Sequence, residues 1–302
     1  MIRKVVRFYE LRGVREEGNG ASTVPVSSDF WTRMADHVES LSARERQVQI
    51  RGRLTHGESR LGRQPALRYF YIAGVRERSE WPDSLSSQTG VVGELQPTDQ
   101  HAVLIEPTYV VPFGATNQVA VVTMSAAAPR VTALESWFTH MLAPDAVLHS
   151  YTLLPVINSR VSERLREARG AAILRVKMAS DVEVPQVGGG VIGNAARAAK
   201  EVSSETDIEL GWSLGRRSGH DDTKAVLLEG ARWVREDFVS TAQVSLELPD
   251  GDDSFRRKQY DLVKEQFTST QKFDVKRDER PSEMSVLTGI NAAIEAFRKE
   301  FS

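Results

Sequence analysis

Two glycine-containing patterns in this chain of 302 residues have the spacing of enzyme motifs. Gly188, Gly190 and Gly193 form G-x-G-x-x-G just before a helix-like segment, which is the pattern of a phosphate-binding turn in dinucleotide enzymes. Such a turn requires a buried strand before it, but the preceding ILRVKMASDVEVPQ carries alternating charges typical of a solvated strand. We therefore interpret residues 187–194 as a hinge, because glycine gives the backbone conformational freedom. The hinge residues are Gly188, Gly189, Gly190 and Gly193.

The second pattern is G-x-S-x-G, which spans Gly211–Gly215 around Ser213 and is found at the nucleophile of many hydrolases. A nucleophilic serine of that kind needs an acid and a histidine later in the chain. The only histidine after Ser213 is His220, which is too close in sequence to fold back from a separate loop. Trp212 and Leu214 are better explained as one face of a strand, so we expect no serine nucleophile here.

Metal-ligand spacing is not evident in the sequence. The chain has no cysteine, and its six histidines show no H-E-x-x-H spacing. We therefore expect no catalytic residues, no metal and no other cofactor. The alternative is a metal-dependent nuclease or a nucleotide-acting defence effector, in which a metal would be bound by carboxylates such as Glu94, Glu106, Asp221 and Asp222.

Arginine is the side-chain type that stands out. Residues 44–78 contain nine arginines and three glutamates, a net charge of +6, and residues 160–177 contain six basic and two acidic residues, a net charge of +4. The planar guanidinium can bind two phosphate oxygens at once and stays protonated. We therefore predict nucleic-acid binding through arginines of these two segments, namely Arg46, Arg51, Arg53, Arg60, Arg63, Arg68, Arg160, Arg164, Arg166 and Arg169.

An acidic segment balances these basic ones, so that the whole chain has a net charge of −2. Residues 201–253 contain thirteen acidic and five basic residues, a net charge of −8. Uneven charge of this kind is informative about partners and not about the fold. It leaves open a further alternative, in which the chain is a protein-interaction module that binds through its acidic Glu201–Asp253 region.

Alternating apolar and polar residues predict strands that must position these arginines. The stretch RQVQIRGRL, Arg46–Leu54, is expected to form one strand with Arg51 and Arg53 on its polar face. Similar strands are expected near Ile2–Leu11 and Gln118–Met124, and Val14–Ser28 is expected to be a loop. Alternation of this kind, with helices at irregular intervals, predicts an α+β fold with a mainly antiparallel sheet and flanking helices.

The last segment is the clearest predicted helix. Its apolar residues recur at alternating intervals of three and four, which places them on one stripe. This stripe is a candidate contact between two copies of the chain, although burial against the chain's own sheet is the commoner use of such a stripe. The stripe consists of Leu287, Ile290, Ile294, Phe297 and Phe301.

Domain boundaries are weakly marked in the sequence. We expect an N-terminal α+β lobe at residues 1–125 with a basic strand face, and a C-terminal α+β lobe at residues 126–302 with the hinge and the terminal helix; a single domain is the alternative. The first residues, MIRKVVRFYELRG, lack the apolar core of a signal peptide, and no run is apolar enough for a membrane helix. The expected location is therefore the cytoplasm.

The order of these elements resembles that of the RexA-type phage-exclusion proteins from about Val91 to the C-terminus. The stretches that carry the resemblance are VPFGATN, ALESWFTHML, SYTLLPVINS, DVEVPQVGGGVIGNA, YDLVKEQFTST and MSVLTGINAAIEAFRKEF. The resemblance implies a prophage-encoded homodimer that binds double-stranded DNA without marked sequence preference and acts in superinfection exclusion. It also implies a hinge within the fold and a RexB-type membrane protein as effector. No motif fixes individual DNA contacts, so the arginines named above come from the charge argument alone.

Overall fold

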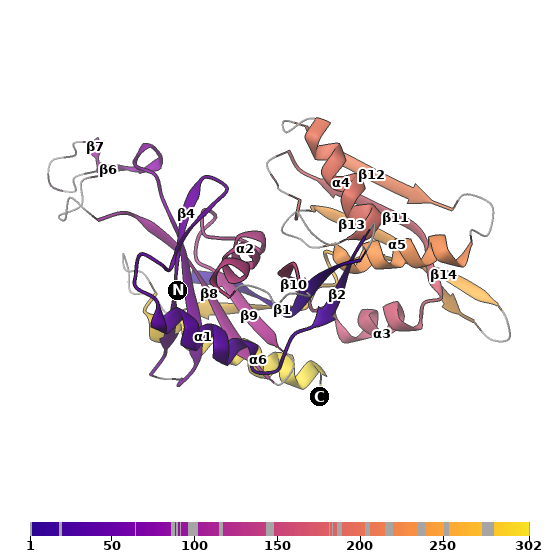
Figure 1. Ribbon diagram of the computed structural model, residues 1–302, viewed down its shortest axis with the longest axis horizontal. Coiled ribbons are helices and arrows are strands. Elements are labelled where there is room, and N and C mark those ends of the chain that lie inside the picture. Colours follow the sequence, from indigo (N-terminus) through magenta and orange to yellow (C-terminus); the bar gives the residue numbers. More distant parts are fainter. Residues whose placement is uncertain are drawn as a thin grey trace.

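Strands that pair only in antiparallel fashion organise the described part of the chain in the computed structural model (Figure 1). Two larger sheets, each with its own helices, form two lobes, and a third sheet contains only two short strands. The structure describes residues 2–17, 20–63, 65–85, 88, 90, 92–95, 102–114, 117–142, 148–180, 182, 184–185, 189–202, 206–214, 220–234, 239–250, 254–273 and 281–301. The predicted α+β class with a mainly antiparallel sheet is confirmed.

The first lobe is built around β1 (Ile2–Glu17), which is long enough to pair with four other strands. The other strands of its sheet are β2 (Gly20–Pro25), β3 (Gln47–Ile50), β4 (Arg53–Leu61), β5 (Arg68–Val75), β8 (Ile105–Phe113), β9 (Gln118–Thr123), β10 (Ser150–Pro155) and β15 (Thr268–Phe273). The order of this nine-stranded sheet is β10-β1-β9-β8-β5-β4-β3, and β2 and β15 also pair with β1.

Helices cover parts of both faces of this sheet. Alternate residues of a strand point to opposite faces, and accordingly Tyr9 packs with α1 (Phe30–Ser40) and α2 (Val131–Met141). Phe8 packs instead with α6 (Glu283–Phe301). We call these two sides of the sheet the α2 face and the α6 face.

The second lobe contains a four-stranded sheet and three helices. Its elements are α3 (Ser159–Glu167), β11 (Gly170–Met178), α4 (Gly190–Val202), β12 (Ile208–Ser213), α5 (Asp221–Trp233), β13 (Thr241–Pro249) and β14 (Phe255–Asp261). The strand order is β12-β11-β13-β14, and the apolar core is formed where α3, α4 and α5 pack against this sheet. The third sheet and a short 3-10 helix lie between β5 and β8, and consist of η1 (Arg78–Glu80), β6 (Asp83–Leu85) and β7 (Val92–Glu94).

The second lobe is inserted between two strands of the first, because the chain leaves after β10 and returns to β15. The two crossings lie side by side, with the N–H of Asn158 donating to the carbonyl of Glu265 at 2.9 Å and the N–H of Phe267 donating to that of Val156 at 2.8 Å. The two sheets therefore do not follow the expected lobes of residues 1–125 and 126–302. Pairing of β10 and β15 with the long β1 is a long-range interaction that local sequence patterns do not reveal.

Two local expectations were wrong at β-hairpins. Residues 46–54 form a hairpin and not one strand, because Arg51 (φ 52°) and Gly52 (φ 82°) adopt the left-handed conformations of a tight turn between β3 and β4. Arg51 thus lies in the turn, and only Arg53 lies on a strand. Likewise, the expected loop Val14–Ser28 contains the end of β1 and all of β2, which pair with each other.

The predicted C-terminal helix is confirmed as α6, and its apolar stripe is in the core. The side chains of Leu287, Ile290, Ile294 and Phe297 are buried against the α6 face, and Phe301 is 36% exposed and stacks on Phe297. This stripe therefore stabilises the first lobe and is not a surface for a second copy. Within the described residues, no helix is long and apolar enough to cross a membrane.

The glycine run lies inside the second lobe, between β11 and α4. Gly188 is outside the described residues, whereas Gly189 (φ 74°) and Gly190 (φ 51°) have the left-handed backbone that glycine tolerates best. A side chain on Gly189 would also collide with the ring of Trp233. Gly193 is buried in the first turn of α4. The glycines thus shape the start of a helix, and the chain passes between the lobes elsewhere, at the crossings beside β10 and β15.

A close contact between β4 and α2 yields a prediction for stability. A Cβ atom on Gly57 would overlap the ring of Trp137, which is fully buried and whose Nε1 donates to the carbonyl of Arg46 at 3.2 Å. We expect Gly57→Ala to lower the free energy of unfolding by about 1–3 kcal/mol, because the core must shift to admit the methyl group. Urea denaturation measures this loss. Gly211→Ala is the control, since its Cβ would lie 3.7 Å from Arg175 Cγ, and an equal loss in both variants would contradict the prediction.

Candidate nucleic-acid interface

Part of the α2 face is left uncovered by helices, and basic side chains lie on it. The register of β1 with β15 places Arg3 opposite Lys272 and Arg7 opposite Thr268, so all four share this face with Tyr9. Arg3, Lys272 and Thr268 are exposed, and Arg7 is half-buried. Two like charges directly opposite each other repel, which destabilises the pair unless an anion lies between them. This part of the sheet is therefore suited to an anionic ligand.

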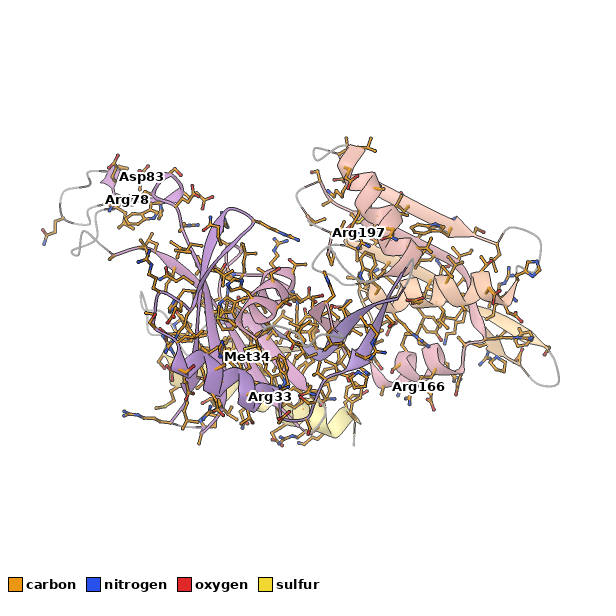
Figure 2. The ribbon with its side chains drawn as sticks, in the orientation of Figure 1. Arg33, Met34, Arg78, Asp83, Arg166 and Arg197 are labelled. Atoms are coloured by element: carbon orange, nitrogen blue, oxygen red, sulfur yellow. The ribbon has the colours of Figure 1, made fainter. Side chains whose placement is uncertain are left out.

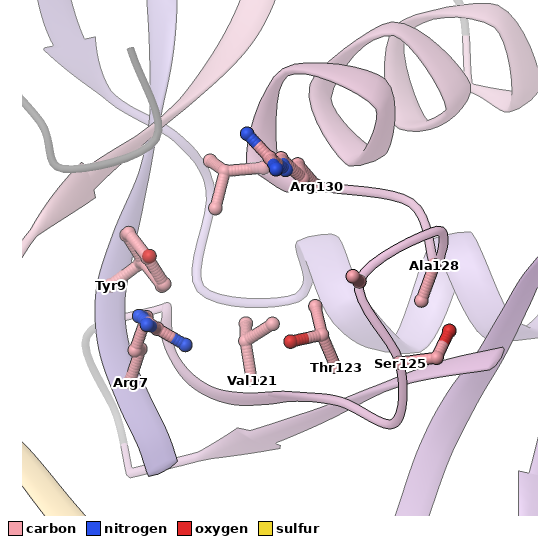
Figure 3. A pocket seen from close by; sticks show the side chains of 9 residues that line it. Arg7, Tyr9, Val121, Thr123, Ser125, Ala128 and Arg130 are labelled. Atoms are coloured by element: carbon pink, nitrogen blue, oxygen red, sulfur yellow. The ribbon is translucent and has the colours of Figure 1, made fainter. Parts of the chain in front are cut away.

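A hollow of about 340 Å³ continues this surface toward the start of α2. Arg7 on β1 and Arg130 at the start of α2 lie on opposite sides of it, and Thr123 lies on the same side as Arg7 (Figure 3). The loop between β9 and α2 contributes Ser125, and Tyr9 forms part of the apolar lining. We call this cavity the first hollow.

A second hollow of about 410 Å³ adjoins the first. The two share Arg130 and residues of the β9–α2 loop, and the second is also lined by Arg51 and Arg53 of the β3–β4 hairpin. Val182 of the second lobe lines it as well, so it opens where the lobes approach each other. The two hollows and the exposed sheet surface thus bring together six basic side chains, which we call the basic face. They are Arg3, Arg7, Arg51, Arg53, Arg130 and Lys272.

The described carboxylates near the basic face lie beside its hollows and not within them. None is among the described residues that line either hollow. Glu80 pairs with Arg53 at 2.7 Å, and Glu106, on the same side of the sheet, is 3.9 Å from Arg76. Counted over the described residues, basic side chains therefore outnumber carboxylates on the basic face, and such an excess attracts anions.

The start of α2 adds to this positive potential. Arg130 is the N-cap residue, and its side chain makes no capping hydrogen bond. Its carbonyl accepts from the N–H groups of Ala133 and Leu134, at 3.0 Å each, and the first turn contains no acidic residue. The positive end of the helix dipole is thus not offset by a carboxylate at the first hollow.

Most of the arginines predicted from the sequence have partners within the chain. Arg46 holds the end of α1, because its Nε donates to the carbonyl of Leu41 at 2.9 Å. Five others form ion pairs, and the pairs are Arg53–Glu80 (2.7 Å), Arg60–Glu58 (2.6 Å), Arg68–Glu39 (3.1 Å), Arg164–Glu167 (2.6 Å) and Arg169–Asp221 (3.7 Å). The guanidinium of Arg60 also lies over the ring of Tyr71, 4.0 Å from its centroid. These arginines stabilise the fold, and of the six only Arg53 belongs to the basic face.

The remaining predicted arginines lie apart from one another. Arg51 lines the second hollow, and Arg63 is exposed in the connection between β4 and β5. Arg160 and Arg166 are exposed on α3, and Figure 2 shows Arg166 on the second lobe. The structure thus brings only Arg51 and Arg53 into the basic face. Sequence reasoning missed Arg3, Arg7, Arg130 and Lys272, because the register that gathers them has no signal in local charge.

The carboxylates of the nuclease alternative lie on separate elements. Glu94 is on β7, Glu106 is on β8, and Asp221 and Asp222 begin α5 in the other lobe. No group of three or more histidine, aspartate or glutamate side chains is arranged to bind a metal in the part of the chain that the structure describes. The geometry therefore does not favour this alternative.

The two glycine patterns also have structural surroundings that differ from those of enzymes. β11, which precedes the glycine run, is antiparallel to both β12 and β13, whereas a dinucleotide turn follows a parallel strand. Ser213 ends β12 at an exposed position, and Trp212 is directed into the second core. Gly215 is outside the described residues.

Several carboxylates of the acidic segment are neutralised within the second lobe. Asp207 is 3.8 Å from Lys177, and the buried Glu247 is 2.9 Å from Lys224. These pairs reduce the acidic surface available to a protein partner.

Comparison of the sequence with models of known families and with curated proteins found no match. The functional interpretation therefore depends on the geometry of the basic face.

Proposed function

We propose that this chain is a non-enzymatic protein that binds the phosphate backbone of double-stranded DNA through its basic face. The observation that carries the proposal is the gathering of six basic side chains, from four separate parts of the sequence, around two adjoining hollows whose described lining contains no carboxylate. Arginine is the residue best suited to phosphate, because its planar fork donates two hydrogen bonds and its charge is permanent.

The binding is proposed to be independent of DNA sequence. Guanidinium and hydroxyl groups donate to phosphate oxygens, which are the same at every base pair. Thr268 supplies a hydroxyl group on the exposed sheet surface of the basic face. Contacts of this kind position a protein on nucleic acid and carry no direct sequence information.

We propose that the chain is located in the cytoplasm and that its biological role is phage exclusion, as the resemblance to RexA-type proteins implies. A homodimer and a RexB-type membrane partner belong to the same proposal. A dimer would have to use a surface other than the apolar stripe of α6, because four of its five residues are buried in the first lobe. The proposal of DNA binding stands on the basic face and does not require these partners.

Titration of the purified chain with a short duplex over a series of salt concentrations tests the proposed function. We expect a complex whose log K falls with log salt by about 0.9 for each phosphate neutralised, which gives a slope of about −3 to −5 for the basic face. We expect the DNA to stay intact when Mg²⁺ is added. A salt-independent affinity would contradict phosphate binding, and shortened DNA would favour the nuclease alternative.

A further inference from the structure

We propose that the first hollow is a pocket for a terminal phosphate, the phosphomonoester at the end of a nucleic-acid strand. This inference rests on the proposed function, because it assigns one part of the basic face to the end of the bound strand. The pocket is formed by Arg7, Thr123, Ser125 and Arg130.

The positive charge around this pocket distinguishes it from a surface that tracks a backbone. A phosphodiester has two non-bridging oxygens and one negative charge, whereas a terminal phosphate has three such oxygens and a charge of about −1.5 to −2 at neutral pH. Arg7 and Arg130 face the first hollow from opposite sides, and the hydroxyl of Thr123 lies on the same side as Arg7 (Figure 3). Two guanidinium groups and the positive end of α2 thus place more positive charge around the first hollow than one diester carries.

The hydroxyl of Ser125 is a second observation that favours a ligand here. Its Oγ atom is shielded from solvent and has no hydrogen-bond partner among the described residues. A buried polar group without a partner is unfavourable, and rotation of the Ser125 side chain toward the first hollow would let a ligand oxygen relieve that cost. Neighbouring Ala126 and Ala128 of the β9–α2 loop offer no side-chain donor or acceptor.

The size and lining of the first hollow suit a phosphate together with its sugar. A volume of about 340 Å³ is at the lower end of pockets that hold small molecules, and it exceeds what a phosphate alone would fill. Tyr9, Val121 and Val131 give it apolar walls, against which a ribose or deoxyribose ring can pack. The second hollow, which is lined by Arg51 and Arg53, adjoins the first, so the bound nucleic-acid strand would continue into it.

The pocket is tested with three DNA duplexes of the same sequence. One carries a 5′-phosphate, one carries a 3′-phosphate, and one has hydroxyl groups at every end. We expect the intact chain to bind one of the phosphorylated duplexes about tenfold more tightly than the unphosphorylated one, because the extra charge and oxygen engage charged donors. In Thr123→Val/Ser125→Ala this preference is expected to disappear, while the affinity for the unphosphorylated duplex stays within about twofold. Thr270→Val, on the same face but outside the first hollow, is expected to keep the tenfold preference.

The possible outcomes separate the pocket from the proposed function. Equal affinity for the three duplexes would overturn the pocket and leave backbone binding intact. Binding to none of them would overturn both. A preference that persists in Thr123→Val/Ser125→Ala, with unfolding curves like those of the unchanged chain, would also overturn the assignment to the first hollow.

Discussion

Replacing Arg7 and Arg130 together by alanine is expected to weaken duplex binding about 100-fold. The two guanidinium groups face the first hollow from opposite sides, and Arg130 lines the second hollow as well. A charge-assisted hydrogen bond to phosphate contributes about tenfold or more, and the two side chains engage the ligand from independent elements, β1 and α2. Fluorescence anisotropy of a labelled duplex at constant salt measures the change.

Two control variants locate the effect on the molecule. Arg298→Ala removes one positive charge from α6, on the other face of the same sheet, and is expected to change the affinity less than twofold. Arg160→Ala/Arg166→Ala removes two exposed arginines from α3 of the second lobe, and we expect a much smaller loss than for Arg7 and Arg130. A 100-fold loss of affinity in Arg160→Ala/Arg166→Ala, with little change in Arg7→Ala/Arg130→Ala, would place the interface on the second lobe instead.

Glu247→Gln is expected to destabilise the second lobe by about 3 kcal/mol, because it leaves the buried ammonium of Lys224 with only the more distant and exposed Asp221, at 3.8 Å, as a carboxylate partner. The side chains of Glu247 and Lys224 are only 8% and 10% exposed, and their charged atoms are 2.9 Å apart. Arg257 donates to the other carboxylate oxygen at 3.0 Å. Urea denaturation of the unchanged and altered chains gives the difference in the free energy of unfolding.

The pH dependence of stability provides an independent check on this site. Burial by itself raises the pKa of Glu247, but hydrogen bonds from Lys224 and Arg257 outweigh it and hold its pKa below the ordinary 4.5. Because its pKa is lower in the folded chain than in the unfolded one, the carboxylate stabilises the fold above pH 4.5, and this contribution is lost as the pH falls through the lowered pKa. The difference in the free energy of unfolding between the unchanged chain and Glu247→Gln should therefore become smaller at acidic pH.

A double variant distinguishes loss of charge from loss of packing at this site. Lys224→Met/Glu247→Leu removes both buried charges and retains apolar volume, so it should recover most of the stability lost in Glu247→Gln. Arg257 is half exposed and remains solvated in this variant. A double variant no more stable than the single one would contradict the charge-based explanation.

The fold class follows from local patterns, because alternation and helical periodicity reflect which side of each element is buried. The terminal helix was predicted for this reason, since its apolar stripe packs on the sheet. The same reasoning predicted one strand at Arg46–Leu54 where the chain forms a hairpin, because the alternation continues across the tight turn at Arg51 and Gly52. It predicted a strand at the start of β1 but not the pairing of β1 with four other strands, three of which come from distant parts of the chain.

The candidate site was only partly predictable from the sequence. Counting charges identified Arg51 and Arg53, which lie in a basic segment. It also selected Arg60 and Arg68, because composition does not show that they pair with carboxylates of the same chain. Conversely, Arg7 lies outside the two segments with a strong basic surplus. The residues of the basic face meet only through the strand register and the turn from β9 into α2.

The salt dependence of duplex binding, compared between the unchanged chain and Arg7→Ala/Arg130→Ala, tests the basic face most directly. Each phosphate contact contributes about 0.9 to the slope of log K against log salt, so loss of two contacts should make the slope about 1.8 less steep. That result would show that these arginines neutralise phosphates. An unchanged slope, whatever the change in affinity, would contradict the claim that the basic face binds the backbone.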